Sequence, residues 1–351
     1  MTKIDQHPAN AFYAPTLLPA IEELLARGAE RERIEAVFRR SLFELRTPFM
    51  RVPLLLSRRF WALAQAHSAD PDIGLSAGRR FFTTSTNGLT YLFDAASSLQ
   101  SACSYFVEYF PFLNGHFRAE VIAGEQAVEL RLHDCGSLRA TAPISDYVLI
   151  SICSMLRRKL LASGLAQDPI LNIGLAHPAP ACTAGHEQAF RVPVYWQQQP
   201  YHAIRLDAQL FGQTLTPGNH ELEQTLVGLL QQTQANSHPT LLELVCDHLL
   251  SEPPGGASLQ DFCASQHLLE RTVARRLKAL GWNFSELLDD YRRYRAEDLL
   301  REQRLELAEI SDQLGYGDVQ SFNRACLRWF DCPPGLYRAI SALPSRPNPP
   351  P

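Results

Sequence analysis

The sequence predicts an α+β N-terminal domain, followed by an all-α C-terminal domain with two helix-turn-helix motifs. Two observations predict this organisation. Short segments between residues 116 and 206 alternate apolar and polar side chains, which is typical of half-buried strands. Beyond residue 240 apolar residues recur at helical spacing instead. There, the stretches 259–281 and 307–330 share one layout of apolar and polar positions.

The N-terminal domain is expected to span residues 1–236 and to begin with helices. Leu17, Ile21 and Leu24 share one helical stripe, and Gly28 ends that helix. Later segments switch to strand periodicity, and a Gln-rich stretch precedes the second domain. The expected elements are helices at 54–67, 99–110 and 144–161, hairpins from 116–122 with 127–133 and from 192–196 with 203–206, a strand at 170–175 and a linker at 231–239.

The C-terminal domain is expected to span residues 237–351, and its second helical pair is defined by local signals. Leu307, Ile310 and Leu314 lie at helical spacing, and Gly315 breaks the helix that they predict. Asp318 is the expected N-cap of the next helix. Two prolines at 333–334 are expected to end that helix soon afterwards.

The helix after Asp318 has one apolar stripe and one polar face. Its polar face suits a DNA major groove, because Arg can bind guanine bidentately, Gln can bind adenine, and Ser can bind a base or a phosphate. A solvated surface helix would show the same pattern. The stripe consists of Val319, Phe322, Cys326 and Trp329, and the polar face of Gln320, Ser321, Arg324 and Arg328.

The same layout occurs 49 residues earlier, between Asp261 and Gly281. Val273 takes the place of Phe322 on the buried stripe, and Arg275 takes the place of Arg324 on the polar face. Two such units in tandem are much less expected by chance than one, so the repeat favours a pair of helix-turn-helix motifs.

The region from Leu241 to Arg338 resembles the DNA-binding domain of the AraC/XylS family of bacterial transcription regulators. Four positions depart from the family pattern, since Cys326-Leu327 replaces an aromatic followed by Lys, Asp331 and His267 replace glycines, and Ala274 replaces a residue that is often polar. The residues that carry the resemblance are Ile310-Ser311, Leu314-Gly315-Tyr316, Ser321-Phe322, Arg324-Ala325, Arg328-Trp329-Phe330, Pro333-Pro334, Tyr337-Arg338, Arg271-Thr272-Val273, Arg275-Arg276-Leu277, Tyr291-Arg292, Arg295-Ala296 and Leu299-Leu300.

The resemblance implies a sequence-specific partner, double-stranded DNA, read in two major-groove segments about one helical turn apart. Base contacts are expected from Arg271, Thr272, Arg275, Gln320, Ser321, Asn323 and Arg324. Phosphate contacts are expected from Arg276, Lys278 and Arg328.

Residues 13–220 resemble the arabinose-binding-like effector-sensing domain of a subgroup of these regulators, through Arg51-Val52-Pro53, Asp72-Ile73-Gly74-Leu75, Gly78-Arg79-Arg80-Phe81 and Leu206-Asp207. This resemblance implies a small-molecule effector, a homodimer and a contact with RNA polymerase, with activation as the expected outcome. Candidate effector contacts are Arg51, whose planar fork suits a carboxylate, and the aromatic residues Tyr91, Tyr105 and Tyr109. Ordinary core packing is the more expected role for each aromatic residue, and a surface or structural ion pair is the more expected role for the arginine.

Charge argues against simple DNA binding and leaves an alternative open. From Thr240 onward the chain has 13 Lys and Arg against 16 Asp and Glu, a net charge of −3, although DNA affinity depends on neutralising phosphates. We expect the basic residues to gather on the recognition helices and the acidic ones on the helix between the units. The alternative is a ligand- or partner-binding protein whose C-terminal domain has lost DNA binding.

Nothing in the sequence indicates catalysis, a cofactor or a metal site. There is no GxSxG, P-loop or GxGxxG motif, so an enzyme hosted by the N-terminal domain has no supporting pattern. His177, Cys182 and His186 share a Pro-rich loop without a spacing typical of zinc ligands, and surface or core roles are expected for them.

A reducing cytoplasm is the expected compartment. The eight cysteines include no CxxC pair, residues 1–15 lack the features of a secretory leader, and no apolar run is long enough to span a membrane. A redox role for Cys326 and Cys332 is conceivable, but inert thiols are the expected reading.

Overall fold

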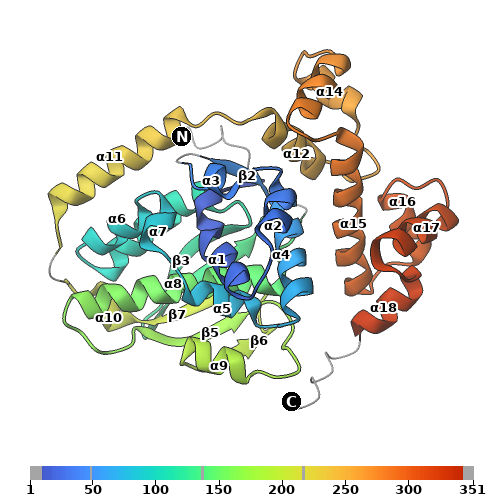
Figure 1. Ribbon diagram of the computed structural model, residues 1–351. Helices are drawn as coiled ribbons and strands as arrows, with labels where there is room; N and C mark the ends of the chain where they lie inside the picture. Colours follow the sequence, from blue (N-terminus) through green and yellow to red (C-terminus); the bar gives the residue numbers. More distant parts are fainter. Residues whose placement is uncertain (1–9, 48–49, 136–137, 216–217, 343–351) are drawn as a thin grey trace.

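The computed structural model of the chain describes residues 10–47, 50–135, 138–215 and 218–342 (Figure 1). Helices and a mixed sheet form the N-terminal part, and the described residues after 240 form only helices, which confirms the predicted fold class. Residues 1–9, the first part of the segment examined for a leader, lie outside the described residues. None of the described helices has the length and apolar character needed to cross a membrane.

The main sheet has five strands in the order β3-β4-β7-β5-β6, with β5 and β6 as the parallel pair. The first predicted hairpin is confirmed, because β3 and β4 pair antiparallel and Gly124 N–H donates to Ala127 O across their turn. A separate two-stranded sheet pairs β1 with β2. The strands are β1 (Ala11–Tyr13), β2 (Arg51–Pro53), β3 (Phe117–Ala123), β4 (Ala127–Asp134), β5 (Ile170–Leu175), β6 (Val194–Trp196) and β7 (His202–Asp207).

The second predicted hairpin is wrong. β6 and β7 follow each other in the chain, but β5 lies between them in the sheet. Gln197 N–H donates to Leu175 O and Ile173 N–H donates to Pro193 O, which extends the parallel pairing of β5 with β6. The segment between β6 and β7 has no two-residue turn signal of the kind that closes a hairpin, and it carries the chain past the end of β5.

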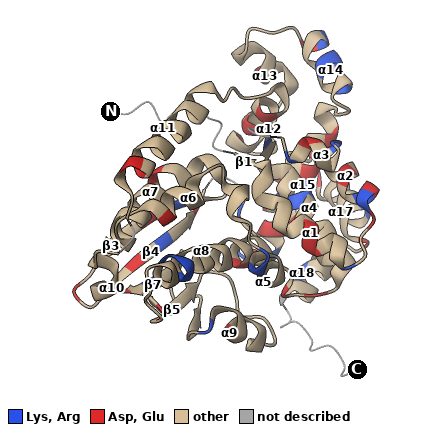
Figure 2. Cartoon of the chain, turned by 60° about the vertical axis from the view of Figure 1, so that its left-hand side comes forward, with Lys and Arg blue, Asp and Glu red and all other residues tan. Residues whose placement is uncertain are grey.

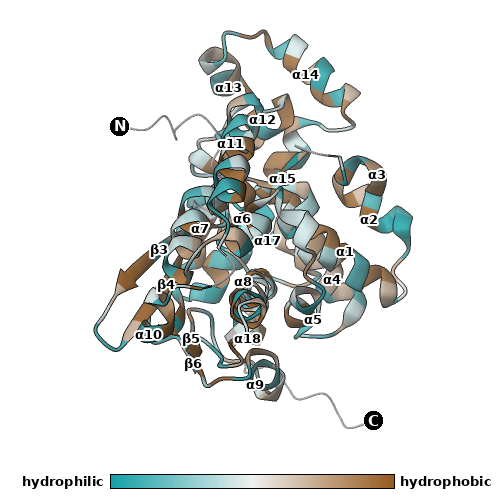
Figure 3. Cartoon of the chain, turned by 90° about the vertical axis from the view of Figure 1, so that its left-hand side faces the viewer, coloured by the Kyte–Doolittle hydropathy of each residue, from teal (hydrophilic) through white to brown (hydrophobic). Residues whose placement is uncertain are grey.

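Helices of the N-terminal part pack on the sheet and on each other, and α8 contributes more buried residues than any other described helix of this part. Figure 3 looks nearly along α8, which lies at the centre of the view with β5 and β6 on one side and α5 on the other. Gly74 and Gly78 allow α5 to approach α8 closely, because a Cβ at either position would lie within 2.5 Å of α8 atoms. The helices are α1 (Leu18–Ala26), α2 (Arg31–Phe38), α3 (Leu42–Leu45), α4 (Leu54–Ser68), α5 (Ile73–Arg79), α6 (Leu89–Ala95), α7 (Leu99–Leu113), α8 (Ala142–Ala162), α9 (Ala184–Phe190), α10 (Ala208–Gly212) and α11 (His220–Asn236), with 3-10 turns η1 (Ala14–Leu17) and η2 (Thr83–Thr86).

The expected linker 231–239 is mostly helical, which corrects that prediction. α11 begins behind Asn219, whose side chain accepts from Leu222 N–H, and continues through the Gln-rich stretch to Asn236. Gln is a good helix former, so a Gln-rich stretch without Gly or Pro extends a helix already begun. Ser237–Pro239 alone separates α11 from Thr240, the N-cap of the next helix. The predicted domain boundary at 236/237 stays a prediction.

Seven helices follow within the described part of the chain, and two pairs of them have the expected helix-turn-helix arrangement. Gly315 has φ +76, and Asp318 caps α17 by accepting from Ser321 N–H. His267 and Asp331 adopt the left-handed conformation that glycine favours at these positions, with φ +54 and +57. Pro333-Pro334 follows the end of α17 and opens the last helix. The helices are α12 (Leu241–Ser251), α13 (Leu259–Ser265), α14 (Glu270–Ala279), α15 (Phe284–Glu302), α16 (Leu307–Gln313), α17 (Val319–Phe330) and α18 (Pro334–Ala342).

The hydrophobic core is divided within the C-terminal domain. Val245, Phe262, Val273 and Tyr294, from the first helix-turn-helix unit and its neighbours, belong to the same buried cluster as the N-terminal domain. A second cluster is built from α15 beyond Ala296, α16 and α17. The first unit therefore shares its core with the N-terminal domain, whereas the second has a core of its own.

Candidate DNA interface and ligand cavity

The recognition helix of the first unit, α14, buries Val273 and Leu277 and exposes its basic residues. Figure 2 shows Lys and Arg on α14, at one end of the molecule. Of the residues predicted to bind DNA, Thr272 is half-buried, and Arg271, Arg275, Arg276 and Lys278 are exposed.

The recognition helix of the second unit, α17, buries Phe322, Cys326 and Trp329 as predicted. Its N-terminus is ordered by a chain of polar contacts. Ser321 Oγ donates to Asp318 Oδ2 at 2.9 Å, and Arg324 Nη2 donates to Ser321 Oγ at 2.8 Å. The Ser321 backbone N–H and hydroxyl lower the pKa of Asp318. Gln320 and Arg324 are exposed and Ser321 and Asn323 are half-buried, which leaves the predicted base-reading residues at the surface.

Arg328, predicted to hold a phosphate, already has a carboxylate partner. Its Nη2 lies 2.5 Å from Asp289 Oδ1 on α15, and Trp329 Nε1 donates to the other oxygen of Asp289 at 3.0 Å. Both charged side chains remain substantially exposed, so the pair is open to solvent and to competing phosphates.

The helix α15 separates the two units (Figure 1). It has 19 residues, a length of about 28 Å at 1.5 Å per residue. Successive major-groove segments on one face of DNA are about 34 Å apart. The spacer is thus of the right order to place two recognition helices one turn apart.

Comparison with known proteins settles the family. The arabinose-binding domain of AraC transcription regulators matches residues 33–215, which is more than half of the chain, and a helix-turn-helix domain matches residues 262–340. The chain belongs to the AraC family of transcription regulators. This family is not enzymatic. The resemblance to the AraC family that the sequence analysis found is confirmed.

Three relatives illustrate the match of this AraC-family chain. The ornithine utilization regulator of Pseudomonas aeruginosa is 26% identical over 330 residues, which cover 93% of this chain and 95% of that protein. The regulator VirS of Mycobacterium tuberculosis is 31% identical over 146 residues, 41% of this chain and 42% of that protein. The crystal structure of the regulator CdpR from Pseudomonas aeruginosa superposes with a TM-score of 0.43 and 21% identity, covering 92% of this chain and 98% of that one.

A buried ion pair joins the two parts of this AraC-family regulator. Arg51 Nε on β2 lies 3.2 Å from Glu243 Oε1 on α12, with both side chains at most 3% exposed. Arg51 Nη1 also donates to Phe112 O, at the end of α7. Burial lowers the pKa of Arg51, and the Glu243 carboxylate opposes that change. Arg51, predicted to meet an effector carboxylate, meets one from the protein itself.

A row of arginines from the N-terminal part continues this interface along α15. Arg39 and Arg59 both reach Glu286 Oε1, at 2.5 and 3.0 Å, and Arg58 reaches Asp298 Oδ1 at 3.1 Å. Burial raises the pKa of Asp298, and Arg58 opposes this rise. The other pairs are Arg59 with Asp290, Arg58 with Glu297 and Arg139 with Glu302.

These contacts account for the acidic C-terminal domain. Six of its carboxylates face arginines of the N-terminal part, namely Glu243, Glu286, Asp290, Glu297, Asp298 and Glu302. From residue 240 onward, the other ten acidic residues are outnumbered by the 13 basic residues, so the rest of the domain has a positive net charge. The predicted segregation of charge by face is therefore present, and the acidic face is the one turned toward the N-terminal domain.

A cavity of about 70 Å³ lies among β1, α4, α7 and α8. Its walls are mostly apolar, with Trp61, Phe106, Phe110 and Met155 among them, and no Lys, Arg, Asp or Glu is among the described residues that line it. Ser57, Ser151 and Asn114 supply polar groups.

His116 is the single imidazole among the described residues lining this cavity. Its Nε2 lies 3.1 Å from Ser57 Oγ, and its buried Nδ1 has no hydrogen-bond partner among the described residues. Burial, with a smaller contribution from Arg58, lowers the pKa of His116 to about 3. The imidazole is therefore neutral at physiological pH and offers the cavity one donor or acceptor without charge.

The residues predicted to bind an effector do not line this cavity. Tyr91 is 43% exposed at the surface, Tyr105 donates to Glu223 at 3.0 Å, and Tyr109 is buried, which raises its pKa to about 12. Phe110, next to Tyr109 on α7, does line the cavity. Sequence reasoning missed Phe106, one turn before Phe110 on α7, and the contributions of α4 and α8.

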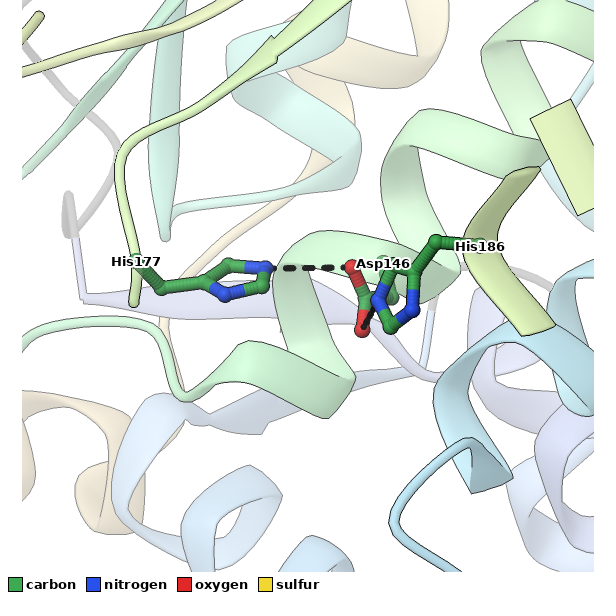
Figure 4. Close-up of side chains that lie close together, drawn as sticks. All are labelled: Asp146, His177 and His186. Atoms are coloured by element: carbon green, nitrogen blue, oxygen red, sulfur yellow. Dashed lines mark hydrogen bonds and ion pairs between the residues drawn. The ribbon is translucent and has the colours of Figure 1, made fainter. Parts of the chain in front are cut away.

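A second cluster of titratable groups lies outside the cavity (Figure 4). Asp146 on α8 accepts from His177 Nε2 and from His186 Nε2, one at each carboxylate oxygen and both at 3.1 Å. Burial alone would raise the pKa of Asp146, but the bonds from His177 and His186 lower it overall. The same contacts outweigh burial at His177 and raise its pKa. The sequence predicts surface or core roles for His177 and His186. It does not predict that both histidines bind Asp146.

Proposed function

We propose that this transcription regulator is an activator controlled by a small, neutral, largely apolar effector that binds in the cavity beside His116. The observation that carries the proposal is the connection of the cavity wall to the interface between the domains. Ser57 lines the cavity and Arg58 beside it pairs with Asp298 of α15. Phe110 and Leu113 line it as well, and between them Phe112 O accepts from Arg51, the partner of Glu243.

The effector class follows from the cavity wall. A carboxylate or ammonium group placed there would lose its hydration without gaining a counter-ion, which is strongly unfavourable. The name of the related regulator points to ornithine, a fully charged amino acid at neutral pH, and that chemistry does not suit this cavity. A neutral molecule with one hydroxyl, carbonyl or amide group would satisfy His116 and Ser57.

The volume limits the effector's size. The cavity holds about 70 Å³, whereas an engineered apolar cavity of about 150 Å³ is known to bind benzene. A ligand with a single ring therefore requires neighbouring side chains to move. Met155, which is flexible, and Phe81, which is half-buried, are the lining residues best suited to move.

Regulation would follow from coupled equilibria. An effector that fits the cavity better in one arrangement of α4 and α7 stabilises the matching arrangement of Arg51 and Arg58, and with it the position of α12 and α15. Since these helices flank the first helix-turn-helix unit and α15 sets the spacing to the second, the effector would change DNA affinity. By linkage, operator DNA changes effector affinity by the same factor.

DNA reading is proposed to use both recognition helices. α14 would place Arg271, Thr272 and Arg275 in one major-groove segment, and α17 would place Gln320, Ser321, Asn323 and Arg324 in the next. Arg276, Lys278 and Arg328 would hold phosphates. The length of α15 and the exposure of these side chains support this assignment.

A homodimer is proposed to form through α11. Leu222, Leu226 and Leu229 follow one another at helical spacing, and Leu222 and Leu229 are 43% and 47% exposed. Pairing two copies of this stripe would cover the leucines, as at a two-helix seam. We further propose that the dimer acts in the cytoplasm, where it contacts RNA polymerase at its promoter.

The test of DNA reading is a binding selection on random duplex DNA with the full chain, at two salt concentrations. We expect enrichment of two short boxes about one turn apart, with affinity that falls steeply with salt. Absence of any enriched site at low salt would favour the alternative of a protein that no longer reads DNA.

Effector binding is tested separately, by screening neutral single-ring alcohols, phenols and amides against charged amino acids. The fluorescence of Trp61, which lines the cavity, supplies the signal, and the Trp61→Phe variant identifies the share of the other tryptophans. Binding of ornithine but of no neutral compound would contradict the proposed effector class.

A further inference from the structure

The cluster of Asp146, His177 and His186 brings three potential metal ligands together from distant segments. Asp146 lies near the start of α8, His177 follows β5, and His186 lies on α9 (Figure 4). One ligand atom from each side chain lies within 4.8 Å of the other two. Asp146 and His186 are 1% and 2% exposed, so the group is enclosed by protein.

The far nitrogen of each imidazole also faces an acceptor. His177 Nδ1 lies 3.1 Å from Pro178 O, which can only accept, so Nδ1–H donates there. His177 Nε2–H donates to Asp146 while no ion is bound, and a bound ion would displace that proton to solvent. His186 Nδ1 lies 3.7 Å from Asp72 Oδ1, and both of these atoms are buried without a hydrogen-bond partner. Histidines that bind metals almost always donate their other N–H to a carbonyl or a carboxylate, which turns the free lone pair of Nε2 toward the ion.

Gly185 permits the second of these contacts. A Cβ at this position would lie 1.9 Å from Asp72 Oδ2. A side chain at position 185 would displace the Asp72 carboxylate, at the start of α5, from its present place beside α9. The chain thus places a carboxylate behind His186 and a carbonyl behind His177, on the sides that face away from Asp146.

We propose that Asp146, His177 and His186 bind a divalent transition-metal ion, for which Zn²⁺ is the best match. This departs from the sequence-based expectation that the chain has no metal site. Two imidazoles and one carboxylate form a ligand set typical of zinc, whereas Ca²⁺ and Mg²⁺ require mostly oxygen ligands. Bonds of about 2.0–2.1 Å in a tetrahedron place neighbouring ligand atoms about 3.4 Å apart. The two N–O distances of 3.1 Å are close to that separation but involve different oxygens of Asp146. The three ligand atoms lie within 4.8 Å of one another, so a bound ion would draw one imidazole toward the oxygen that holds it.

The bound ion would replace the two hydrogen bonds to Asp146 and join three elements. α8, α9 and the segment after β5 meet at the ion, and Asp72 adds α5 through His186. A water molecule would complete the fourth position, on the side of the half-buried His177. Because the ion would join three elements that are distant in the chain, it would act as a structural link in the N-terminal domain.

The test uses the full chain without a purification tag, in which Cys182→Ser removes an exposed thiol that would bind metal nonspecifically. After treatment with a chelator, the protein is titrated with Zn²⁺ against a chromophoric competitor. We expect about one Zn²⁺ per chain and a higher melting temperature in its presence. Co²⁺ in place of Zn²⁺ should give the visible absorption of tetrahedral coordination by nitrogen and oxygen.

Matched variants distinguish Zn²⁺ binding at this cluster from Zn²⁺ binding at other histidines of the chain. His177→Gln and His186→Gln should each lower Zn²⁺ affinity at least tenfold, whereas His133→Gln, a partly exposed histidine paired with Glu120, should bind as the parent does. Two results would overturn the proposal. One is failure of the parent to compete for Zn²⁺ or to give the Co²⁺ absorption, and the other is unchanged Zn²⁺ affinity in His177→Gln and His186→Gln.

Discussion

Arg51 and Glu243 form an ion pair that is buried on both sides and joins the two parts of the chain, with 3.2 Å between Nε and Oε1. The two residues are 192 positions apart. A buried pair of this kind contributes little relative to an apolar pair, but removal of one partner leaves an uncompensated charge. The Arg51–Glu243 ion pair therefore contributes more to the relative arrangement of the two domains than to the free energy of unfolding.

The first prediction concerns this pair. Arg51→Met should destabilise the protein by about 3–5 kcal/mol, because it strands the Glu243 carboxylate. The double variant Arg51→Met/Glu243→Leu should recover most of that loss. Urea unfolding of both single variants and the double variant measures the coupling. Arg40→Ala, which removes a partner from the exposed pair Arg40–Glu44, serves as the control and should cost less than about 1 kcal/mol.

The second prediction concerns Asp289, which pairs with Arg328, a residue proposed to hold a DNA phosphate. Asp289→Asn keeps an acceptor for Trp329 Nε1 but removes the charge that pairs with Arg328. Affinity for DNA at low salt should rise, and the salt dependence should steepen by about one phosphate contact. Asp331→Asn, which removes an exposed charge just past the end of α17, the helix of Arg328, is the control. Equal gains in the two variants would show that net charge alone is responsible.

The third prediction concerns base reading by α17. Arg324→Ala should cost about 1–3 kcal/mol in binding and relax the preference at one base pair, since its planar fork is lost. Arg276→Ala should instead weaken all sequences alike, as expected of a phosphate contact. Repeating the binding selection with each variant measures both effects. An unchanged site preference in Arg324→Ala would remove Arg324 from the base-reading set.

The fourth prediction is a pH dependence of stability caused by His116. Its pKa is about 3 in the folded protein against 6.5 without burial, so the unfolded chain binds more protons between these values. Stability from this residue is complete above pH 6.5 and declines as the pH falls, by about 2 kcal/mol at pH 5. His116→Asn should flatten the decline by that amount in denaturant unfolding at pH 7 and pH 5, and His133→Gln should not.

The fifth prediction tests the proposed dimer. Leu222→Arg/Leu229→Arg places like charges on the stripe of α11 and should dissociate the dimer, which sedimentation velocity would detect. Gln224→Arg/Gln231→Arg introduces the same charges at exposed positions of the same helix outside the stripe. A dimer that survives the first change, or is lost in both variants, would exclude this stripe as the specific contact.

Local signals predicted the C-terminal domain well, because its elements depend on nearby residues. Asp318 caps α17 through Ser321, three residues away, and the buried stripes follow helical periodicity. The order of strands was not predictable in the same way. The placement of β5 between β6 and β7 depends on pairing between strands that short-range patterns do not specify.

The site residues of the N-terminal domain escaped prediction for a related reason. Asp146 meets His177 and His186 from 31 and 40 positions away, and Arg51 meets Glu243 across the whole N-terminal domain. The planar guanidinium of Arg51 made it a candidate for binding a ligand carboxylate. The fold shows that its carboxylate partner is Glu243 of α12. Phe106 and Phe110 were visible as aromatic residues, but the walls opposite them come from α4 and α8.

The first helix-turn-helix unit shares buried side chains with the N-terminal domain, whereas the second is built on its own cluster. Over generations, a substitution inside the first unit must therefore remain compatible with the domain that holds the cavity. Substitutions inside the second unit escape that constraint. We expect related regulators to acquire new operator sequences mainly through substitutions in α17. The half-site proposed for α14 should change more slowly, together with substitutions in the N-terminal domain.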